Sequence, residues 1–267
     1  MLRSLASAAA TASRQRHVLI TGAAKGIGAA TAERFAASGF RVLLHYRSNA
    51  AEAEAVRLAL QPCAAAGSHM CLHAALDEPG ASEALVKRAL DECDGELDVL
   101  VVNHGTYEET PVETASATEW SRSFERVLRT NLAAPAELAF AYGSAARLRS
   151  AGGAIVFVSS RGAYRGEPLA PAYGASKAGL NSLTGSLAQA FGPHGVRVSA
   201  VAPGFVATAM ASAVLQSPRG ESIRSQSPFH RVGKPQEVAN TIFFLASEEA
   251  TWSTGAILDC NGASYLH

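Results

Sequence analysis

The sequence has no excess of charge of either sign and no long hydrophobic run. Its 267 residues include 23 Lys and Arg and 23 Asp and Glu, so the formal net charge is zero. A chain without a positive field has no general attraction to nucleic acid or to an anionic membrane. The apolar run 97–102, which Asp98 interrupts, is far shorter than the ~18 residues of a membrane-spanning helix. We therefore expect neither nucleic acid nor a membrane as a partner, and any anion site must be local.

Cysteines are also few and far apart. There are four of them, Cys63, Cys71, Cys93 and Cys260, with no CxxC pair and no HExxH motif in the chain. This spacing excludes the usual zinc sites and a small disulfide scaffold. The sequence therefore predicts reduced thiols and no bound metal.

Acidic residues are missing from the start of the chain, where the first one is Glu33. Residues 1–16 contain three arginines together with Ser and Ala, which is the composition of an organelle transit peptide. The alternative is a disordered tail that targets nothing. A transit peptide would place the protein in the mitochondrial matrix or the matrix of another organelle, and a disordered tail would leave it in the cytoplasm.

The rest of the chain has the composition of a globular protein, with 48% hydrophobic and 17% charged residues. From residue 17 onward, short β-branched runs alternate with longer Ala-rich stretches, the pattern of a parallel sheet with crossover helices. It predicts one α/β domain over residues 17–267, of the doubly wound Rossmann type, with a seven-stranded parallel sheet flanked by helices. The expected strands are 17–21, 41–46, 69–73, 98–102, 154–158, 196–201 and 256–259, and the expected helices are 27–38, 50–60, 82–93, 119–148, 173–191 and 235–247. The irregular stretch 205–233 is predicted to be a lid or binding loop.

A glycine-rich turn follows the first expected strand. Residues 21–28 read TGAAKGIG, which places Gly22, Gly26 and Gly28 between a strand and a helix, with Lys25 and Ile27 among them. Glycines allow the backbone to approach a pyrophosphate, and the free N–H groups at the start of the helix bind its negative charge. The turn predicts a dinucleotide site; the alternative is a tight turn kept for packing.

The end of the second strand indicates which dinucleotide binds. A carboxylate there would accept hydrogen bonds from the ribose and repel a 2′-phosphate, but the sequence has Tyr46, Arg47 and Ser48 instead. Together with Lys25, these cationic and polar groups favour the extra phosphate of NADP(H). The alternative is that each cation is an ordinary surface charge.

Tyr173 and Lys177 are four residues apart at the start of an expected helix, so they share one face of it. A nearby ammonium favours the phenolate and is expected to lower the Tyr173 pKa. Ser160 lies thirteen residues upstream of Tyr173, at the carboxyl end of an expected strand. Sites of parallel sheets lie at this edge, so the three residues are candidates for one catalytic site.

These motifs resemble those of the short-chain dehydrogenases/reductases, from about residue 17 to the C-terminus. The resemblance implies hydride transfer between a nicotinamide and a carbonyl or alcohol carbon. Tyr173 would be the proton donor, Ser160 would bind the substrate oxygen, and Lys177 would bind the nicotinamide ribose and feed a proton relay whose water Asn131 anchors. Further cofactor contacts are implied at Asn103, Gly105, Pro203, Gly204 and Thr208.

One neighbour of Asn131 gives a physical reason for its role. Pro135 has no N–H, so the α-helical bond that would end on the Asn131 carbonyl cannot form, and this carbonyl is free for water. Two positions depart from the family pattern: NNAG reads Val102-Asn103-His104-Gly105, and Ala74 replaces the aspartate that contacts adenine. We expect looser adenine binding, and we expect His104 either to line the nicotinamide pocket or simply to pack.

The C-terminal stretch from Arg231 to Gly262 is similar to the branch of β-ketoacyl-acyl-carrier-protein reductases, enzymes of fatty acid biosynthesis. This similarity implies a 3-oxoacyl thioester as the substrate and an acyl carrier protein as a partner. The carrier protein is acidic, so a basic rim is expected, with Arg147, Arg149, Arg161 and Arg165 as candidates. The family's own rim positions are Ala151 and His194 here, and Arg161 and Arg165 are equally well explained as structural surface cations. Two alternatives remain: a reductase or dehydrogenase of another ketone, aldehyde, quinone or secondary alcohol, and a non-catalytic NADP-binding sensor. The resemblance also implies a homotetramer built partly on the helix that carries Tyr173 and on the long helix before it.

Overall fold

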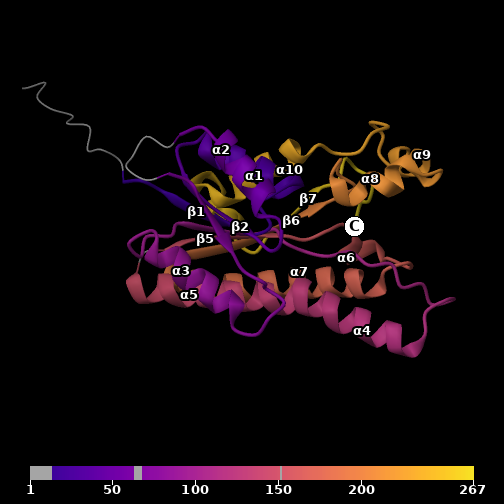
Figure 1. Cartoon of the computed structure of the whole chain (residues 1–267), viewed down its shortest axis with the longest axis horizontal. Helices are drawn as coiled ribbons and strands as arrows, with labels where there is room; N and C mark the ends of the chain where they lie inside the picture. The colour runs from indigo at the N-terminus through magenta and orange to yellow at the C-terminus, as the bar shows by residue number, and fades with distance from the viewer. Residues whose placement is uncertain (1–13, 63–67, 151) are drawn as a thin grey trace, which may run out of the picture.

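The computed structural model describes residues 14–62, 68–150 and 152–267. Seven parallel strands form one sheet in the order β3-β2-β1-β4-β5-β6-β7 (Figure 1). The chain thus begins in the middle of the sheet, winds outward to β3, returns to β4 and continues to β7, which confirms the doubly wound fold. The strands are β1 (His17–Ile20), β2 (Arg41–Tyr46), β3 (Met70–His73), β4 (Val99–Val102), β5 (Gly153–Val158), β6 (Val196–Pro203) and β7 (Ile257–Cys260).

Helices cover both faces of this sheet. Figure 1 shows α1 (Gly26–Ala36), α2 (Ala50–Ala59) and α10 (Pro235–Ala246) on one side. On the other side lie α3 (Ala81–Asp91), α4 (Ala117–Leu128), α5 (Ala134–Arg149) and α7 (Pro171–Phe191). The central strands are therefore apolar on both faces, as buried parallel strands must be, and each face has its own cluster of buried side chains.

Two expected elements differ from the structure. The helix expected over 119–148 is α4 and α5 joined by a π-turn at Arg129–Ala133, where the Ala134 N–H donates to the Arg129 carbonyl. The loop expected over 205–233 is not irregular throughout, because it contains α8 (Ala209–Gln216) and α9 (Arg219–Arg224). We call residues 205–233 the substrate loop. It lies with the short helix α6 (Gly162–Arg165) at the carboxyl edge of the sheet.

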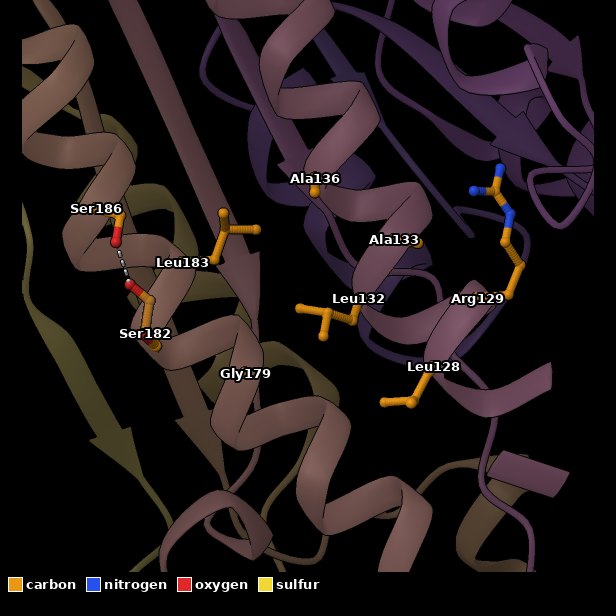
Figure 2. Close-up of a pocket in the computed structure, with 9 residues that line it drawn as sticks. All are labelled: Leu128, Arg129, Leu132, Ala133, Ala136, Gly179, Ser182, Leu183 and Ser186. Carbon is orange, nitrogen blue, oxygen red and sulfur yellow. Dashed lines mark hydrogen bonds between the residues drawn. The ribbon is translucent and has the colours of Figure 1, made fainter. Parts of the chain in front are cut away.

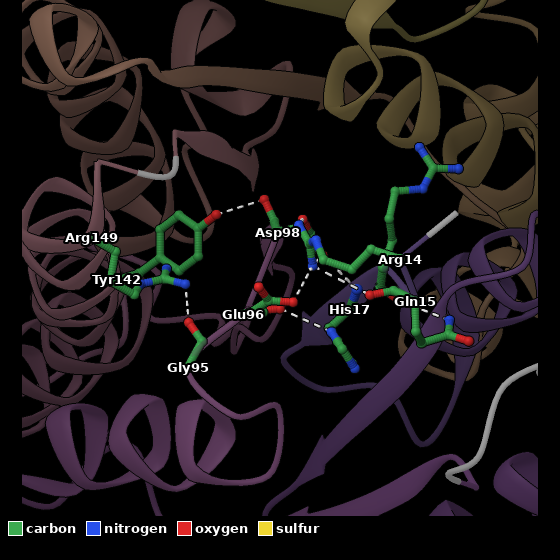
Figure 3. Close-up of polar contacts among 9 residues, drawn as sticks. Arg14, Gln15, His17, Gly95, Glu96, Asp98, Tyr142 and Arg149 are labelled. Atoms are coloured by element: carbon green, nitrogen blue, oxygen red, sulfur yellow. Dashed lines mark hydrogen bonds and ion pairs between the residues drawn. The ribbon is translucent and has the colours of Figure 1, made fainter. Parts of the chain in front are cut away.

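The first described residues are held at the opposite edge of the sheet (Figure 3). Arg14 forms ion pairs with Glu96 and Asp98, and Asp98 also accepts from the His17 backbone N–H at 2.7 Å. Of the expected leader over 1–16, residues 1–13 lie outside the described residues, and so does Cys63. No helix in the part of the chain that the structure describes is long and apolar enough to cross a membrane.

The three described cysteines, Cys71, Cys93 and Cys260, are free thiols. Burial raises the pKa of Cys71 to about 11 and that of Cys93 to about 12, and it also raises the pKa of Cys260. Protonated thiols are poor nucleophiles and poor metal ligands. Within residues 14–62, 68–150 and 152–267 there is also no cluster of three side chains suited to a metal ion.

Candidate active site

The glycine turn is shaped so that glycine is required at its key positions. Gly22 and Gly26 have φ angles of 65° and 57°, in the left-handed region that favours glycine. A Cβ atom at Gly28 would lie 2.2 Å from the Gly22 carbonyl oxygen, so no larger residue fits. Helix α1 begins at Gly26, Ile27 is partly buried in its first turn, and Lys25 is exposed just before it. The turn therefore presents backbone N–H groups and one cation at the carboxyl edge of the sheet.

Two side chains fix this turn from behind. Asn103 donates through Nδ2 to the carbonyls of Thr21 and Gly22, at 2.9 and 3.1 Å. His45, buried in β2, accepts from the Gly22 N–H through Nδ1 at 3.1 Å, and its Nε2 lies 3.0 Å from the Ala74 carbonyl. Burial lowers the His45 pKa to about 4, so the ring is neutral and its Nε2–H donates to Ala74.

His104 packs behind the same turn. The Thr21 hydroxyl accepts the N–H groups of Asn103 and His104, so its single proton is available for His104 Nδ1 at 2.8 Å. Burial lowers the His104 pKa to about 3, which keeps the ring neutral. These contacts fix the ring, but its buried Nε2 has no hydrogen-bond partner among the described residues, so both expected roles of His104 remain open.

The residues expected to select NADP(H) lie at the end of β2. Arg47 and Ser48 are exposed, and the ring of Tyr46 lies 5.4 Å from that of His73. Arg47 forms an exposed ion pair with Asp77, at 3.5 Å. Such a pair has little strength, so the guanidinium remains available to a phosphate.

Ser160, Tyr173 and Lys177 come together at the carboxyl edge. Ser160 follows β5, and its hydroxyl accepts from the Gly162 N–H at 3.0 Å. Tyr173 and Lys177 lie one turn apart in α7. Lys177 is buried, donates from Nζ to the Val158 carbonyl at 2.8 Å and lies 5.7 Å from the centre of the Tyr173 ring. The structure therefore places these three candidates in one cluster.

The expected lowering of the Tyr173 pKa is wrong for this structure. Burial raises the pKa of the phenol, and a hydrogen bond with Ser160 opposes this effect only in part. The ammonium of Lys177 donates to the Val158 carbonyl and lies 5.7 Å from the centre of the Tyr173 ring. Burial lowers the pKa of Lys177 itself to about 8.

Asn131 lies inside the π-turn, and its side chain is fully used within the protein. Its Oδ1 accepts from the Thr106 N–H at 2.8 Å, and its Nδ2 donates to the Thr106 carbonyl and to Ser176, at 2.9 and 3.2 Å. The residue thus joins the loop after β4 to α7. A contact with a relay water would fall to its backbone, next to Pro135 in the first turn of α5.

The remaining cofactor candidates surround the same edge. A Cβ atom at Gly105 would lie 3.2 Å from Asn131 Oδ1 and 3.6 Å from Lys177 Nζ, and one at Gly26 would lie 3.1 Å from the Thr208 methyl group. Pro203 ends β6, and Gly204 follows it against Asn261. The backbone cradle, the free helix start and the exposed cations Lys25 and Arg47 together fit a phosphorylated dinucleotide.

The basic rim expected among four arginines is wrong. Arg147 and Arg149 lie in the last turn of α5, at the opposite edge of the sheet, where Arg149 donates to the Gly95 carbonyl (Figure 3). Arg161 is buried, and Arg165 pairs with Glu167 at 3.2 Å. Arg147 and Arg149 lie at that edge because α5 runs antiparallel to the strands, so its last turn is far from their carboxyl ends.

Sequence reasoning missed two residues of this region. His45 was counted only as part of a strand, although a histidine in a buried apolar strand needs polar partners. Tyr107 packs edge-to-face on Tyr173 with ring centres 5.2 Å apart, and its hydroxyl lies 3.4 Å from Glu109. Glu109 in turn pairs with Arg219 of α9, which links this wall to the substrate loop. No pattern in the sequence connects these positions.

Comparisons with known proteins agree with this geometry. A family profile described as Enoyl-(Acyl carrier protein) reductase matches residues 22–262. The 3-oxoacyl-[acyl-carrier-protein] reductase FabG of Escherichia coli is 34% identical over 93% of this chain and 96% of its own. Protein FixR of Bradyrhizobium diazoefficiens is 37% identical over 93% of this chain and 86% of its own.

Solved structures show the same fold. The crystal structure of gox2181 has a TM-score of 0.83 at 27% identity and covers 94% of this chain and 95% of that one. A short chain dehydrogenase/reductase family protein has a TM-score of 0.80 at 29% identity, over 94% of this chain and 97% of that one. Fold, motifs and relatives agree, and the chain belongs to the short-chain dehydrogenase/reductase family, in which it resembles FabG.

Proposed function

We propose that this chain uses NADPH to reduce a carbonyl group to an alcohol, with Tyr173 as the proton donor. The observation that carries the proposal is the cluster of Ser160, Tyr173 and buried Lys177 at the edge where the glycine turn lies. NADPH supplies the hydride when bound. The glycine turn and the backbone at Asn103 and Gly105 would hold it, with Ile27, Pro203, Gly204 and Thr208 beside them.

The proposed proton transfer follows from the surroundings of each side chain. The Ser160 hydroxyl donates to the carbonyl oxygen and fixes its position. Because burial raises the Tyr173 pKa, the phenol remains protonated and can donate to this oxygen as negative charge develops there. Lys177, whose pKa is about 8, exchanges protons readily near neutral pH and restores the phenol. The Asn131 backbone carbonyl anchors the water that continues this relay.

The first candidate substrate is a 3-oxoacyl thioester, on the strength of the FabG relatives. The loss of the expected basic rim favours a second candidate, another small ketone, aldehyde, quinone or secondary alcohol that needs no carrier protein. If an acyl carrier protein is the partner, it must dock on residues other than the four expected arginines. The exposed Lys25 and Arg47 support NADP(H) rather than NAD(H).

We also propose that the chain assembles as a homotetramer. A groove of about 570 Å³ lies between α7 and the chain around the π-turn. Figure 2 shows Leu132 and Leu183 facing each other across it. Small residues such as Ala136, Gly179 and Ser182 line it as well. Small side chains let a second helix approach closely, and covering this groove would bury its leucines.

The experiment is an absorbance assay of NADPH consumption with an acetoacetyl thioester and a panel of ketones, aldehydes and quinones. Oxidation of NADPH by any of them supports the reductase and identifies its substrate class. Tight NADPH binding without turnover of any carbonyl would instead indicate the binding-only sensor.

A further inference from the structure

Two cationic side chains are buried among the described residues, and the proposed reaction uses one of them. Lys177 is 4% exposed and belongs to the catalytic cluster, whereas Arg161 is 3% exposed and has no part in it. Removing a charge from water is strongly unfavourable unless an opposite charge or several hydrogen bonds replace the water. The burial of Arg161 therefore needs a reason of its own.

The partners of Arg161 within the described chain do not replace that water. A guanidinium has five N–H donors. One goes to Gln226 Oε1 at 2.6 Å and one to the Ser264 carbonyl at 3.4 Å, which is long for a hydrogen bond. No described carboxylate lies within ion-pair distance of it; Glu167 pairs with Arg165 instead. Among the described residues Arg161 thus has no anion at ion-pair distance, and Glu167 attracts it only from farther away.

Arg197 shows how the same fold treats another arginine that lacks an ion pair among the described residues. Its guanidinium donates to the carbonyls of Ala246 and Ser247, at the carboxyl end of α10. That helix end carries partial negative charge, which stabilises a cation. Arg161 has no equivalent, because Ser264 lies in the C-terminal tail and ends no helix.

Arg161 instead faces a cavity of about 190 Å³ between the substrate loop, the start of α10 and the exit of β7. Arg231, another charged residue of its lining, pairs with Glu237 at 2.7 Å, and Asp259 lies 3.4 Å from His267, a pair that is ionic only when the imidazole is protonated. Phe205 and Phe229 give the lining an apolar part, and Arg161 lies 5.2 Å from the Phe205 ring centre. Ser160, Tyr173 and Lys177 are not among its lining residues, so the cavity adjoins the catalytic cluster through Arg161, which follows Ser160, but does not contain it.

We propose that this cavity binds a small monocarboxylate, held by Arg161, with its short alkyl part against Phe205 and Phe229. The planar fork of a guanidinium matches the two oxygens of a carboxylate. The ligand would also touch both ends of the substrate loop, because Phe205 begins that loop and Gln226 and Ser227 lie near its end. Binding should therefore stabilise the loop in its present position. The proposal does not depend on the proposed reaction.

The test uses the purified full chain and sodium butyrate as the probe, at constant ionic strength against sodium chloride. We expect saturable butyrate binding in titration calorimetry and a rise in the melting temperature that chloride does not give. Arg161→Gln should weaken butyrate binding at least about tenfold, because a charge-assisted pair is lost. Arg147→Gln, the same change at an exposed position on the opposite edge of the sheet, should bind butyrate as the unmodified chain does.

Two further variants keep the proposal testable if Arg161→Gln does not fold. Arg161→Lys keeps the charge but loses the fork, so it should also bind butyrate more weakly. Phe229→Ser should weaken binding of butyrate more than binding of formate, because formate has no alkyl part. Absence of butyrate binding, equal binding by Arg161→Gln or Arg161→Lys, or competition between butyrate and NADPH would each overturn the proposal.

Discussion

The two halves of the carboxyl edge are built in different ways. Beside β1, β2 and β4, the glycine turn is fixed by backbone groups and by the short-range partners Asn103 and His45. Beside β5, β6 and β7, backbone hydrogen bonds close the substrate loop at its base, between Phe205 and Gly233. Its middle is held mainly through side chains, such as Arg161 with Gln226 and Arg219 with Glu109. The first half has the rigidity that a common cofactor requires, and the second can vary with the substrate.

Tyr173→Phe tests the cluster where the two halves meet, and it has the largest expected effect. It removes the proton donor and keeps the ring, so carbonyl reduction should fall about 10²- to 10⁴-fold while NADPH binding remains. Steady-state rates and cofactor fluorescence titration measure the two quantities. Tyr107→Phe is the matched control, because it loses only a 3.4 Å contact with Glu109. Activity of Tyr173→Phe within tenfold of the unmodified chain contradicts the mechanism.

Gly185→Trp tests whether α7, which both halves share, also supports assembly. A Cβ atom at Gly185 has no neighbour within 4 Å, so the tryptophan fits one subunit but blocks a second helix. We expect the unmodified chain near 110 kDa, four times 27.7 kDa, and the variant at a smaller mass with lower activity. Light scattering measures both masses. Gly192→Trp is the control: this position is equally open but lies beyond the end of α7, so the variant should still assemble. If the unmodified chain is a monomer, the proposed homotetramer is excluded.

Arg47→Asp sharpens the cofactor half of the comparison. The new carboxylate would both remove an attraction for the 2′-phosphate and repel it, so NADPH should bind at least about tenfold more weakly. NADH binding should be unchanged or improved. Arg122→Asp, the same change at an exposed site on α4, should alter neither affinity. A preference for NADH before any change would show that Lys25 and Arg47 do not select the cofactor.

The last prediction concerns stability rather than binding or rate, and it involves the neutral histidines behind the glycine turn. The pKa values of His45 and His104, lowered to about 4 and about 3, lie below the unfolded value of 6.5. At a pH between the folded and the unfolded pKa values, these histidines are protonated in the unfolded chain but not in the folded chain. The free energy of unfolding therefore falls as the pH falls. Each histidine contributes about 1.4 kcal/mol per pH unit. Denaturant unfolding at pH 4 to 6 should show a shallower pH dependence for His104→Ala, but not for the exposed His194→Ala.

The sequence predicted the cofactor half better than the substrate half for a physical reason. Gly22, Gly26 and Gly28 work through local backbone geometry, and Tyr173 and Lys177 through helix spacing, so a short pattern contains the information. The contacts of Arg161 join residues 65 and 103 positions apart and depend on tertiary packing. For the same reason Arg161 was expected in a basic rim and lies buried. The π-turn was missed because the apolar pattern of a helix continues through it.

The π-turn at Arg129–Ala133 also determines how the chain tolerates insertions and deletions. It contains i to i+5 hydrogen bonds where an α-helix has i to i+4 bonds, so removing one residue would restore a regular helix. The same deletion would rotate α5 relative to α4 by about 100° about the helix axis. Either Asn131 would leave Thr106 and Ser176, or the buried Leu138 and Tyr142 would turn away from the sheet. A shorter and more regular helix would therefore make the chain less stable. The length of this segment is fixed by the hydrogen bonds of Asn131 before α5 and by the buried side chains of α5 itself.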